Sequence, residues 1–388
     1  MAEQLGPVGP APDTDDARQG PREGIALCCS GGGYRAMMFH AGALIRLNEA
    51  ALLSRLKRVS SVSGGSIVTG VLGLFWKQLQ FETNGPAKNL NLVVDKLREM
   101  ASTTIDEGSV LGGLFSSDTI SERIIEAYRK HLFGNATLQD LPDDIAGPRF
   151  VINATNVQTG ALFRFSKPYL ADYRLGTYPT PSVPLAIAVA ASSAFPPFLS
   201  PVDLVLDGQF WKPDAISDLC KAPYTTNLVL SDGGVYDNLG LETAWKNYKT
   251  ILVSDGGGKL AGEEKPSRDW VRHSKRVLDI IDNQVRSLRY RNLIDSYKAP
   301  STQSNFRSGA YWGIRTNIDD YKLADALAAP HNKSLELANT PTRLKAMDPQ
   351  LQNRLMNWGY AVCDAALRAY YDQHLSAPKN LPFPNDQI

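Results

Sequence analysis

The distribution of apolar residues indicates a strand near the start of the chain that leads through a tight turn into a helix. Residues 24–29 (GIALCC) form a short apolar run followed by a serine and three glycines, the pattern of a buried strand entering a turn. Residues 34–53 place apolar side chains at helical spacing and are rich in Ala, Leu and Met, which predicts a helix. The order repeats with residues 59–62, a Ser-Gly-Gly-Ser turn and residues 67–79. Strand, glycine turn and helix therefore occur twice in succession.

Further apolar runs continue the alternation of strands and helices. Residues 149–154 and 162–165 have strand character, residues 185–191 predict a helix of small residues, and residues 227–230 and 250–253 are short apolar runs that each lead into Ser-Asp-Gly-Gly. Alternation of this kind favours a mainly parallel central sheet, because the helices that connect parallel strands cover both of its faces. We therefore expect an α/β fold.

The sequence pattern changes after residue 260. Two long helical stretches, residues 270–291 and 342–371, flank a polar region that contains residues 305–320. This pattern predicts a helical C-terminal extension, residues 261–388, packed on a sheet domain of residues 24–260.

Two other segments have a distinct composition. Residues 1–23 are rich in Pro, Gly, Asp and Ala without an apolar core, so we expect a flexible N-terminal arm rather than a signal peptide. Residues 87–128 look mostly helical, with a glycine-rich break at residues 108–113 that we expect to be a mobile loop.

Composition and charge narrow the classes of function. The 43% hydrophobic residues are typical of a globular protein, and 41 basic against 40 acidic residues leave no charge excess for nucleic acid. The densest basic cluster, residues 286–291, is best explained as a solvated helix face. Four cysteines are too few for a disulfide scaffold and indicate reduced thiols and a cytoplasmic protein. The longest apolar stretch, residues 183–199, is interrupted by prolines and serines, so any contact with a membrane would be transient and peripheral.

The second glycine turn carries a serine at its tip. Ser63 follows a β-prone segment and precedes a helix, a geometry in which a serine Oγ stands exposed above a sheet edge. Gly64 and Gly65 provide the small neighbours that such a bend requires. The helix that begins near Gly64 would direct its positive N-terminal end at the serine. This pattern is that of a nucleophile, although a Ser-Gly-Gly-Ser sequence can also be only a turn.

The first glycine turn suggests a cradle for negative charge. Three successive glycines, Gly31, Gly32 and Gly33, allow backbone N–H groups to point at one place, as in an oxyanion hole or a phosphate site. Arg35 could steady this loop or attract an anionic headgroup. The Gly-Lys-Ser/Thr of a nucleotide-binding loop is missing from the sequence, and a purely structural turn is the other interpretation.

A serine nucleophile needs a base to take its proton. Of the five histidines, only His40 follows a candidate motif, and a packed or hydrogen-bonded role explains it better. A carboxylate in a desolvated cleft can serve instead, because desolvation raises its basicity. The two Ser-Asp-Gly-Gly copies offer Asp232 and Asp255, and the Asp-Gly pair at Asp207 is a weaker third candidate.

Taken together and in order, these motifs resemble the patatin-like phospholipase family. The resemblance rests on three glycines followed by x-Arg35, on x-Ser63-Gly-Gly, and on Asp232-Gly-Gly. Residues 190–197 (AASSAFPP) are similar to the small-residue helix and proline turn that precede the family's catalytic aspartate, and the resemblance covers residues 24–260. It implies a three-layer α/β/α patatin-like fold and hydrolysis of ester bonds in phospholipids or other lipids, with no metal and no cofactor.

The resemblance also implies roles for single residues. Ser63 corresponds to the nucleophile and Asp232 to the base of a Ser–Asp dyad that contains no histidine. The amides of Gly31, Gly32 and Gly33 correspond to the oxyanion hole, supported by Arg35, Gly64 and Gly65. Asp232 is preferred to Asp255 because residues 235–240 (VYDNLG) continue the family pattern. The sequence departs from the family at Ser61, which stands where the nucleophile turn usually has glycine.

Alternative functions share these motifs. A thioesterase or an acyltransferase would use the same dyad. A regulated phospholipase effector would use its C-terminal helices to sense a ligand or partner. A catalytically dead scaffold would not need both Ser63 and Asp232, so the intact motifs argue against it.

Overall fold

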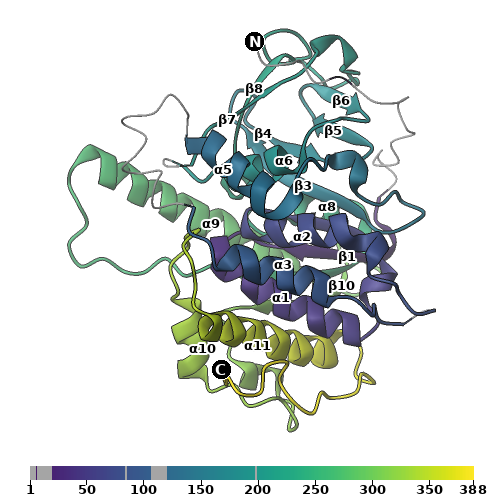
Figure 1. The fold of residues 1–388 in the computed structure, drawn as a ribbon, viewed down its shortest axis with the longest axis vertical. Coiled ribbons are helices and arrows are strands. Elements are labelled where there is room, and N and C mark those ends of the chain that lie inside the picture. The colour runs from purple at the N-terminus through teal and green to yellow at the C-terminus, as the bar shows by residue number, and fades with distance from the viewer. Residues whose placement is uncertain (1–5, 7–19, 84, 106–119, 197–198) are drawn as a thin grey trace.

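The computed structural model describes residues 6, 20–83, 85–105, 120–196 and 199–388. Within these residues one ten-stranded mixed sheet crosses the molecule (Figure 1). Its main path runs in the order β10 (Ser308–Gly313), β9 (Tyr248–Asp255), β1 (Arg22–Cys29), β2 (Leu56–Ser61), β3 (Arg149–Asn156), β4 (Ala161–Phe165), β5 (Tyr169–Asp172) and β6 (Gly176–Pro179). Strand β8 (Asn227–Asp232) pairs with β3 and with β7 (Val202–Val205).

The sheet has a parallel half and an antiparallel half. Strands β10, β9, β1, β2 and β3 pair in parallel, whereas β4 to β8 join through antiparallel pairs. The predicted mainly parallel α/β sheet is confirmed for the part that carries both glycine turns. The antiparallel half arises because β3 to β6 follow one another through short connections, which allow only antiparallel neighbours.

Helices cover both faces of the parallel half. On one face lie α1 (Gly33–Glu49), α2 (Gly64–Phe75), α3 (Asn91–Ala101) and α11 (Pro349–Ala366), which Figure 1 shows side by side in front of the sheet. The other face packs against α8 (Glu242–Trp245) and the end of α9 (Trp270–Lys298), through Leu241, Ala244 and Leu293. Strand β1 alternates between the two cores: Leu27 contacts the first and Cys28 the second, as the two-residue period of a strand requires.

The remaining helices are shorter. They are α5 (Ile120–Tyr128), α6 (Leu185–Ser192), α7 (Gly234–Asp237) and α10 (His331–Ala338). Single turns of 3₁₀ or π type complete the described elements: Leu53–Arg55, Trp76–Gln78, Arg129–Phe133, Leu138–Asp140, Gly208–Phe210, Ile318–Tyr321 and Leu367–Tyr371. None of the helices in the described part of the chain is both long and apolar enough to cross a membrane.

The C-terminal residues contribute a strand as well as helices. The region predicted to be polar, residues 305–320, contains β10, which pairs with β9 at the edge of the central sheet. Its short sequence, Ser308–Gly313 (SGAYWG), has no alternation of apolar and polar residues that would have revealed a strand. The predicted helices α9 and α11 are present, and the domain boundary near residue 260 stays a prediction.

Two other predicted segments lie wholly or mostly outside the described residues. The glycine-rich break at residues 108–113 lies outside the described residues, as does most of the predicted N-terminal arm. Strand β1 already begins at Arg22, just before the predicted end of that arm.

Candidate active site

The turn that carries Ser63 and the end of strand β8 meet on one edge of strand β3. Strand β2 pairs with the first half of β3, up to Ser61 opposite Ile152, and β8 pairs with the second half, with Asp232 opposite Ala154. Because β4 occupies the other edge of β3, β2 and β8 must share this one. Since β2 runs parallel and β8 antiparallel to β3, their carboxyl ends point at each other.

Ser63 lies in a strained turn between β2 and α2. Its φ of 52° and ψ of −122° are values that side-chain-bearing residues rarely adopt and that recur in nucleophile elbows. A Cβ at Gly64 would overlap the carbonyl oxygen of Gly33, and one at Gly65 would overlap that of Cys29. Both predicted glycines are therefore required by the close approach of the two glycine turns. Ser63 itself remains 9% exposed.

A buried polar network holds this turn in place. The backbone N–H of Ser63 donates to both the carbonyl oxygen (3.1 Å) and the Oγ (3.0 Å) of Ser192. The Ser192 hydroxyl in turn donates to the carbonyl oxygen of Asn153 at 2.6 Å. Ser66 lies 2.8 Å from Ser192 and donates to Ser61. Ser61, the residue that replaces the family's glycine, thus accepts a hydrogen bond inside the elbow that glycine could not accept.

Asp232 is a buried carboxylate beside Ser63. Ser63 lies near enough to lower the pKa of this carboxylate, and Asp232 Oδ1 accepts the backbone N–H of Gly234 at 2.6 Å. Its own backbone N–H donates to Ala194, and its carbonyl oxygen accepts Thr155 Oγ1. Burial raises the pKa of Asp232 from 3.8 to about 7, against the lowering effect of the bonds from Gly234 and Ser63. A carboxylate with this pKa is a competent base near neutral pH.

The first glycine loop lies against the elbow. A Cβ at Gly31 would come within 3.1 Å of the Ser63 Cβ, so the loop and the nucleophile turn face each other. The N–H of Gly31 already donates to Asn238, to its backbone oxygen and to its Oδ1, both at 3.1 Å. The N–H groups of Gly32 and Gly33 donate to no acceptor among the described residues. Helices α1 and α2 begin at Gly33 and Gly64, which brings two positive helix ends to one place.

Arg35 supports this loop from behind. Its Nε donates to the carbonyl oxygen of Gly256 and its guanidinium to that of Thr340. Burial lowers the pKa of Arg35 to about 10. The side chain is 3% exposed, so it ties the loop to the C-terminal residues rather than meeting a headgroup in solvent.

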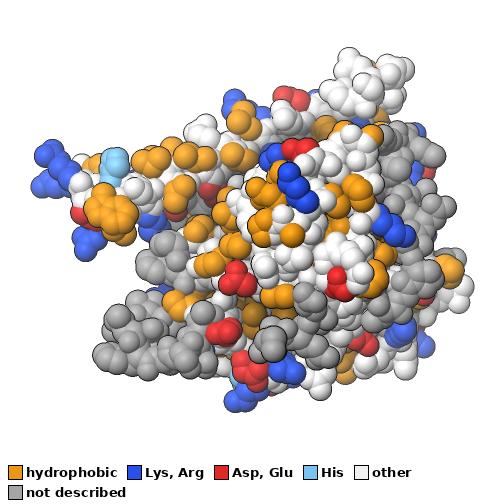
Figure 2. All heavy atoms as spheres, turned by 90° about the horizontal axis from the view of Figure 1, so that it is seen from above, with side chains coloured by type: hydrophobic (Ala, Val, Ile, Leu, Met, Phe, Trp, Pro, Cys, Tyr) orange, Lys and Arg blue, Asp and Glu red, His pale blue; other side chains and the backbone are white. Residues whose placement is uncertain are grey.

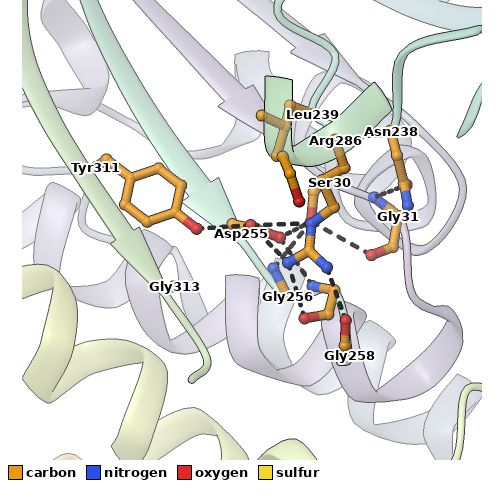
Figure 3. Close-up of polar contacts among 12 residues, drawn as sticks. Ser30, Gly31, Asn238, Leu239, Asp255, Gly256, Gly258, Arg286, Tyr311 and Gly313 are labelled. Atoms are coloured by element: carbon orange, nitrogen blue, oxygen red, sulfur yellow. Dashed lines mark hydrogen bonds and ion pairs between the residues drawn. The ribbon is translucent and has the colours of Figure 1, made fainter. Parts of the chain in front are cut away.

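Asp255, the rival base, is occupied by other partners (Figure 3). Its carboxylate accepts hydrogen bonds from Ser30 Oγ (3.1 Å), Arg286 (2.7 Å) and Tyr311 (2.7 Å). The pKa of Asp255 is lowered, because the charge of Arg286 and these bonds outweigh burial. Asp255 therefore remains ionised and paired, and it links the glycine loop at Ser30 to α9 and β10.

The other two alternatives, His40 and Asp207, also make hydrogen bonds elsewhere. His40 is buried, with its ring nitrogens 2.7 Å from Ser254 Oγ and 2.9 Å from the Ser30 carbonyl oxygen, and burial lowers its pKa to about 4. It is thus the hydrogen-bonded histidine that the sequence favoured. Asp207 caps a short turn by accepting the N–H of Gln209 at the surface.

Several residues around the pair were missed by the sequence analysis as contributors to the site. Ser192 and Asn153 orient the elbow, and Asn238 fastens the glycine loop. Asn238 lies within the segment that continues the family pattern after Asp232, a signal that could have pointed to it. Asn153 lies in a strand with no local motif, and only the pairing of β3 reveals its position.

Comparisons with known proteins agree with this architecture. The family model "Patatin-like phospholipase" matches residues 27–245. The solved structure of human GIVD cytosolic phospholipase A2 matches 89% of this chain and 60% of its own, with 12% identity and a TM-score of 0.50. The same human protein in complex with methyl gamma-linolenyl fluorophosphonate and terbium chloride matches with 14% identity, 89% and 59% coverage and a TM-score of 0.50.

A bacterial structure matches more weakly. VipD from Legionella pneumophila has 15% identity, 95% and 71% coverage and a TM-score of 0.36. No curated protein matches the sequence. At such identities the human structures support the fold alone, and this chain spans about three fifths of their length.

The family model covers more than half of the chain, and its range includes both glycine turns and the Asp232 motif. The chain therefore belongs to the patatin-like phospholipase family of serine hydrolases.

Proposed function

We propose that this protein is a lipid acyl hydrolase of the phospholipase A type, with Ser63 as nucleophile and Asp232 as general base. One observation carries the proposal: a serine in a strained strand-to-helix turn lies beside a buried carboxylate with a pKa of about 7. A purely structural serine has no need of that backbone strain or of a desolvated partner.

In the first half of the reaction, Asp232 accepts the proton of Ser63 as Oγ attacks the ester carbonyl carbon. The tetrahedral intermediate collapses, the ester C–O bond breaks, and protonated Asp232 returns the proton to the leaving alkoxide. In the second half Asp232 takes a proton from water, which attacks acyl-Ser63. The carboxylic acid is released and Ser63 regains its proton.

The N–H groups of Gly32 and Gly33 are the leading donors to the oxyanion. The N–H of Gly31 already donates to the backbone oxygen and to Oδ1 of Asn238, so an oxyanion would have to compete with these two acceptors for it. Loss of one such donor typically costs about 100- to 1000-fold in rate. The network of Ser192 and Asn153 holds the backbone of Ser63 in the elbow, which limits the positions that its hydroxyl can take beside Asp232.

The substrate follows from family membership. A phospholipid or another lipid ester fits a family named for phospholipases, and the similar human structures carry the name cytosolic phospholipase A2. All four cysteines are free thiols, which supports a cytoplasmic protein. Such an enzyme would reach its substrate by transient contact with a membrane surface.

The test is hydrolysis of a short-chain chromogenic ester and of phospholipid vesicles by the wild-type protein and by variants. Ser63→Ala and Asp232→Asn should each lower kcat by about 1000-fold or more, because both halves of the reaction need both groups. Asp207→Asn is the matched control, since it removes a surface carboxylate from another Asp-Gly pair, and it should be as active as wild type.

A fluorophosphonate probe separates nucleophile from base. It should label wild type at Ser63, label Asp232→Asn slowly and leave Ser63→Ala unlabelled, as judged by intact mass. Full activity of Asp232→Asn, or labelling at another residue, would contradict the assignment. Inactivity of folded wild type on both substrates would contradict the proposed function itself.

A further inference from the structure

Helix α9 extends beyond the body of the protein. Of its 29 residues only Leu293 and Ser296 are buried, and both lie near its C-terminal end. The ion pairs that fasten it also lie in that half: Arg286 bonds Asp255 at 2.7 Å and Arg289 bonds Glu242 at 2.9 Å. Figure 1 shows the other end projecting away from the sheet and its covering helices. We call residues 270–285 the α9 arm.

One side of α9 carries an unusually exposed row of apolar side chains. Trp270 (80% exposed), Ile281 (53%) and Leu288 (50%) follow one another at intervals of eleven and seven residues, which places them on one line of a helix. Two more exposed side chains, Val277 and Leu278, fill the gaps. We call these five residues the apolar stripe. Figure 2 shows it as a row of hydrophobic side chains along the protruding arm.

The stripe is larger than an isolated surface residue requires. From Trp270 to Leu288 it runs about 27 Å along the helix axis. Contiguous apolar patches of this kind mark surfaces that meet a partner or a membrane. Because its side chains are exposed in the folded chain, no described part of this protein covers it.

Basic residues surround the free end of the arm. Five of the twelve residues from 265 to 276 are basic and one, Asp269, is acidic, and the acidic partners Glu263 and Asp279 stand on either side of this segment. Figure 2 shows Lys and Arg gathered at the tip. The ion pairs that Arg272, Lys275 and Arg276 form lie at or near the surface. Such pairs are weak and screened, so an anionic surface can compete for the cations.

The stripe and the basic tip together define the occupant. A helix with Trp and Leu on one side and Lys and Arg around them has the composition of helices that lie in the interface of an anionic membrane. A partner protein would gain little from cations placed around a tryptophan at the far end of an unsupported helix, whereas headgroups and acyl chains meet both features at once.

The arm also starts beside the candidate active site. Helix α9 contacts α7, which directly follows Asp232. Asp282, on the arm, is close enough for its charge to contribute to the raised pKa of Asp232. Two exposed apolar residues, Val235 and Phe195, flank the backbone that holds Asp232. A lipid surface bound by the arm would therefore lie near the place where an ester must enter.

We propose that the apolar stripe of α9 docks the protein on an anionic lipid surface, with the basic tip of the arm among the headgroups. The inference deepens the proposed function and rests on it for the substrate class, but the docking itself can be measured without catalysis.

The experiment compares binding and turnover in one set of full-length proteins. Co-sedimentation uses vesicles of phosphatidylcholine alone and of phosphatidylcholine mixed with phosphatidylserine, at low and high salt. The stripe variant is Trp270→Ser/Leu278→Ser/Ile281→Ser. The matched control is Ile145→Ser/Ile216→Ser, which removes exposed apolar side chains that lie outside α9. Hydrolysis of the short-chain soluble ester is measured in parallel.

Wild type and control should bind the anionic vesicles and release them as salt rises. The stripe variant should bind about tenfold more weakly or worse, because apolar area no longer enters the interface. Its rate of hydrolysis of vesicle phospholipid should fall in proportion to the loss of binding. Its rate with the soluble ester should stay within about twofold of the wild-type rate, since the stripe is separate from Ser63 and Asp232.

Three results would overturn the inference: wild type that does not bind anionic vesicles, a stripe variant that binds as well as wild type, or a wild-type dimer that the stripe variant converts to monomer, which would assign the stripe to a second copy. Binding without any esterase activity would instead contradict the proposed function and leave the docking surface standing.

If the stripe variant does not fold, a second experiment tests the same contact. Brominated lipid should quench the tryptophan fluorescence of wild type, and this quenching is compared with that of Trp270→Phe. An unchanged quenching signal in Trp270→Phe would reject it.

Discussion

At the scale of single residues, the environment of Asp232 decides its chemistry. An aspartate in water is ionised far below neutral pH, but burial raises the pKa of Asp232 to about 7. Asp255, the aspartate of the other copy of the same motif, is also buried, yet Arg286 lowers its pKa. Two carboxylates with the same local sequence thus differ in basicity because the cation of Arg286 lies beside Asp255.

The rate of ester hydrolysis should follow the ionisation of Asp232. Only the carboxylate form can accept the Ser63 proton, so kcat/KM for a soluble ester should rise with pH and reach half of its plateau near pH 7. A profile measured from pH 5 to pH 9 checks this. A rate that is constant over that range would show that the controlling base has an ordinary aspartate pKa.

Stability should change in the opposite direction. Because the folded-state pKa of Asp232 is raised above its unfolded value of 3.8, the folded protein holds a proton that the unfolded chain releases, and this group destabilises the fold as pH rises from about 4 to about 7. Asp232→Asn should therefore be more stable than wild type at pH 8, by on the order of 4 kcal/mol at most, and similar to it at pH 4. Urea unfolding at both pH values measures the difference, with Asp207→Asn as control. An equal stability difference at pH 4 and pH 8 would show that ionisation of Asp232 does not destabilise the folded protein.

At the scale of elements, two helices from opposite ends of the chain depend on glycines for their contact. A Cβ at Gly42 in α1 would overlap the carbonyl oxygen of Met356 in α11, and a Cβ at Gly359 would overlap that of Phe39. The two backbones can approach only because neither position has a side chain. Helix α1 begins at the glycine loop, so this packing also supports the candidate site.

Gly359→Ala should separate the two helices and lower stability by about 1–3 kcal/mol or more, as overpacked cores do. Gly262→Ala is the matched control, because no atom lies within 4 Å of its Cβ position. Thermal and urea unfolding of both variants measure the effect. Equal stability of the two variants would mean that the helices can shift apart without cost.

At the scale of the whole molecule, the residues after 260 complete the sheet. Strand β10 pairs with β9, and α11 packs beside α1 on one face of the sheet. Removal of both would expose the edge of β9 and the apolar face of α1 to water. The C-terminal residues are thus joined to the hydrolase fold through its central sheet, whatever further role α9 has.

A chain that ends at residue 260 should therefore fail to fold cooperatively. Expression of residues 20–260 should give insoluble protein or a product without a sigmoidal urea transition, whereas the full chain shows one. A soluble fragment with cooperative unfolding and esterase activity would establish residues 24–260 as an independent domain, as the sequence suggested.

Much of this architecture followed from local patterns. The apolar runs predicted β1, β2, β3, β4, β8 and β9, and the helical spacing predicted α1, α2, α6, α9 and α11. The glycine turns indicated where the chemistry lies, because steric limits on φ and on close backbone approach act within a few residues. Strand β10 was missed since a short strand at a sheet edge leaves little periodicity in the sequence.

What the sequence determined by itself is the set of elements, the motifs and the family they resemble, since these depend on neighbouring residues. Only the tertiary structure decided that β8 runs antiparallel along the same edge of β3 as β2, which brings Asp232 to Ser63. It also decided that Asp255 is neutralised by Arg286 and that the stripe of α9 is exposed. Charge pairing, burial and strand direction are set by residues far apart in the chain, so no local pattern can contain them.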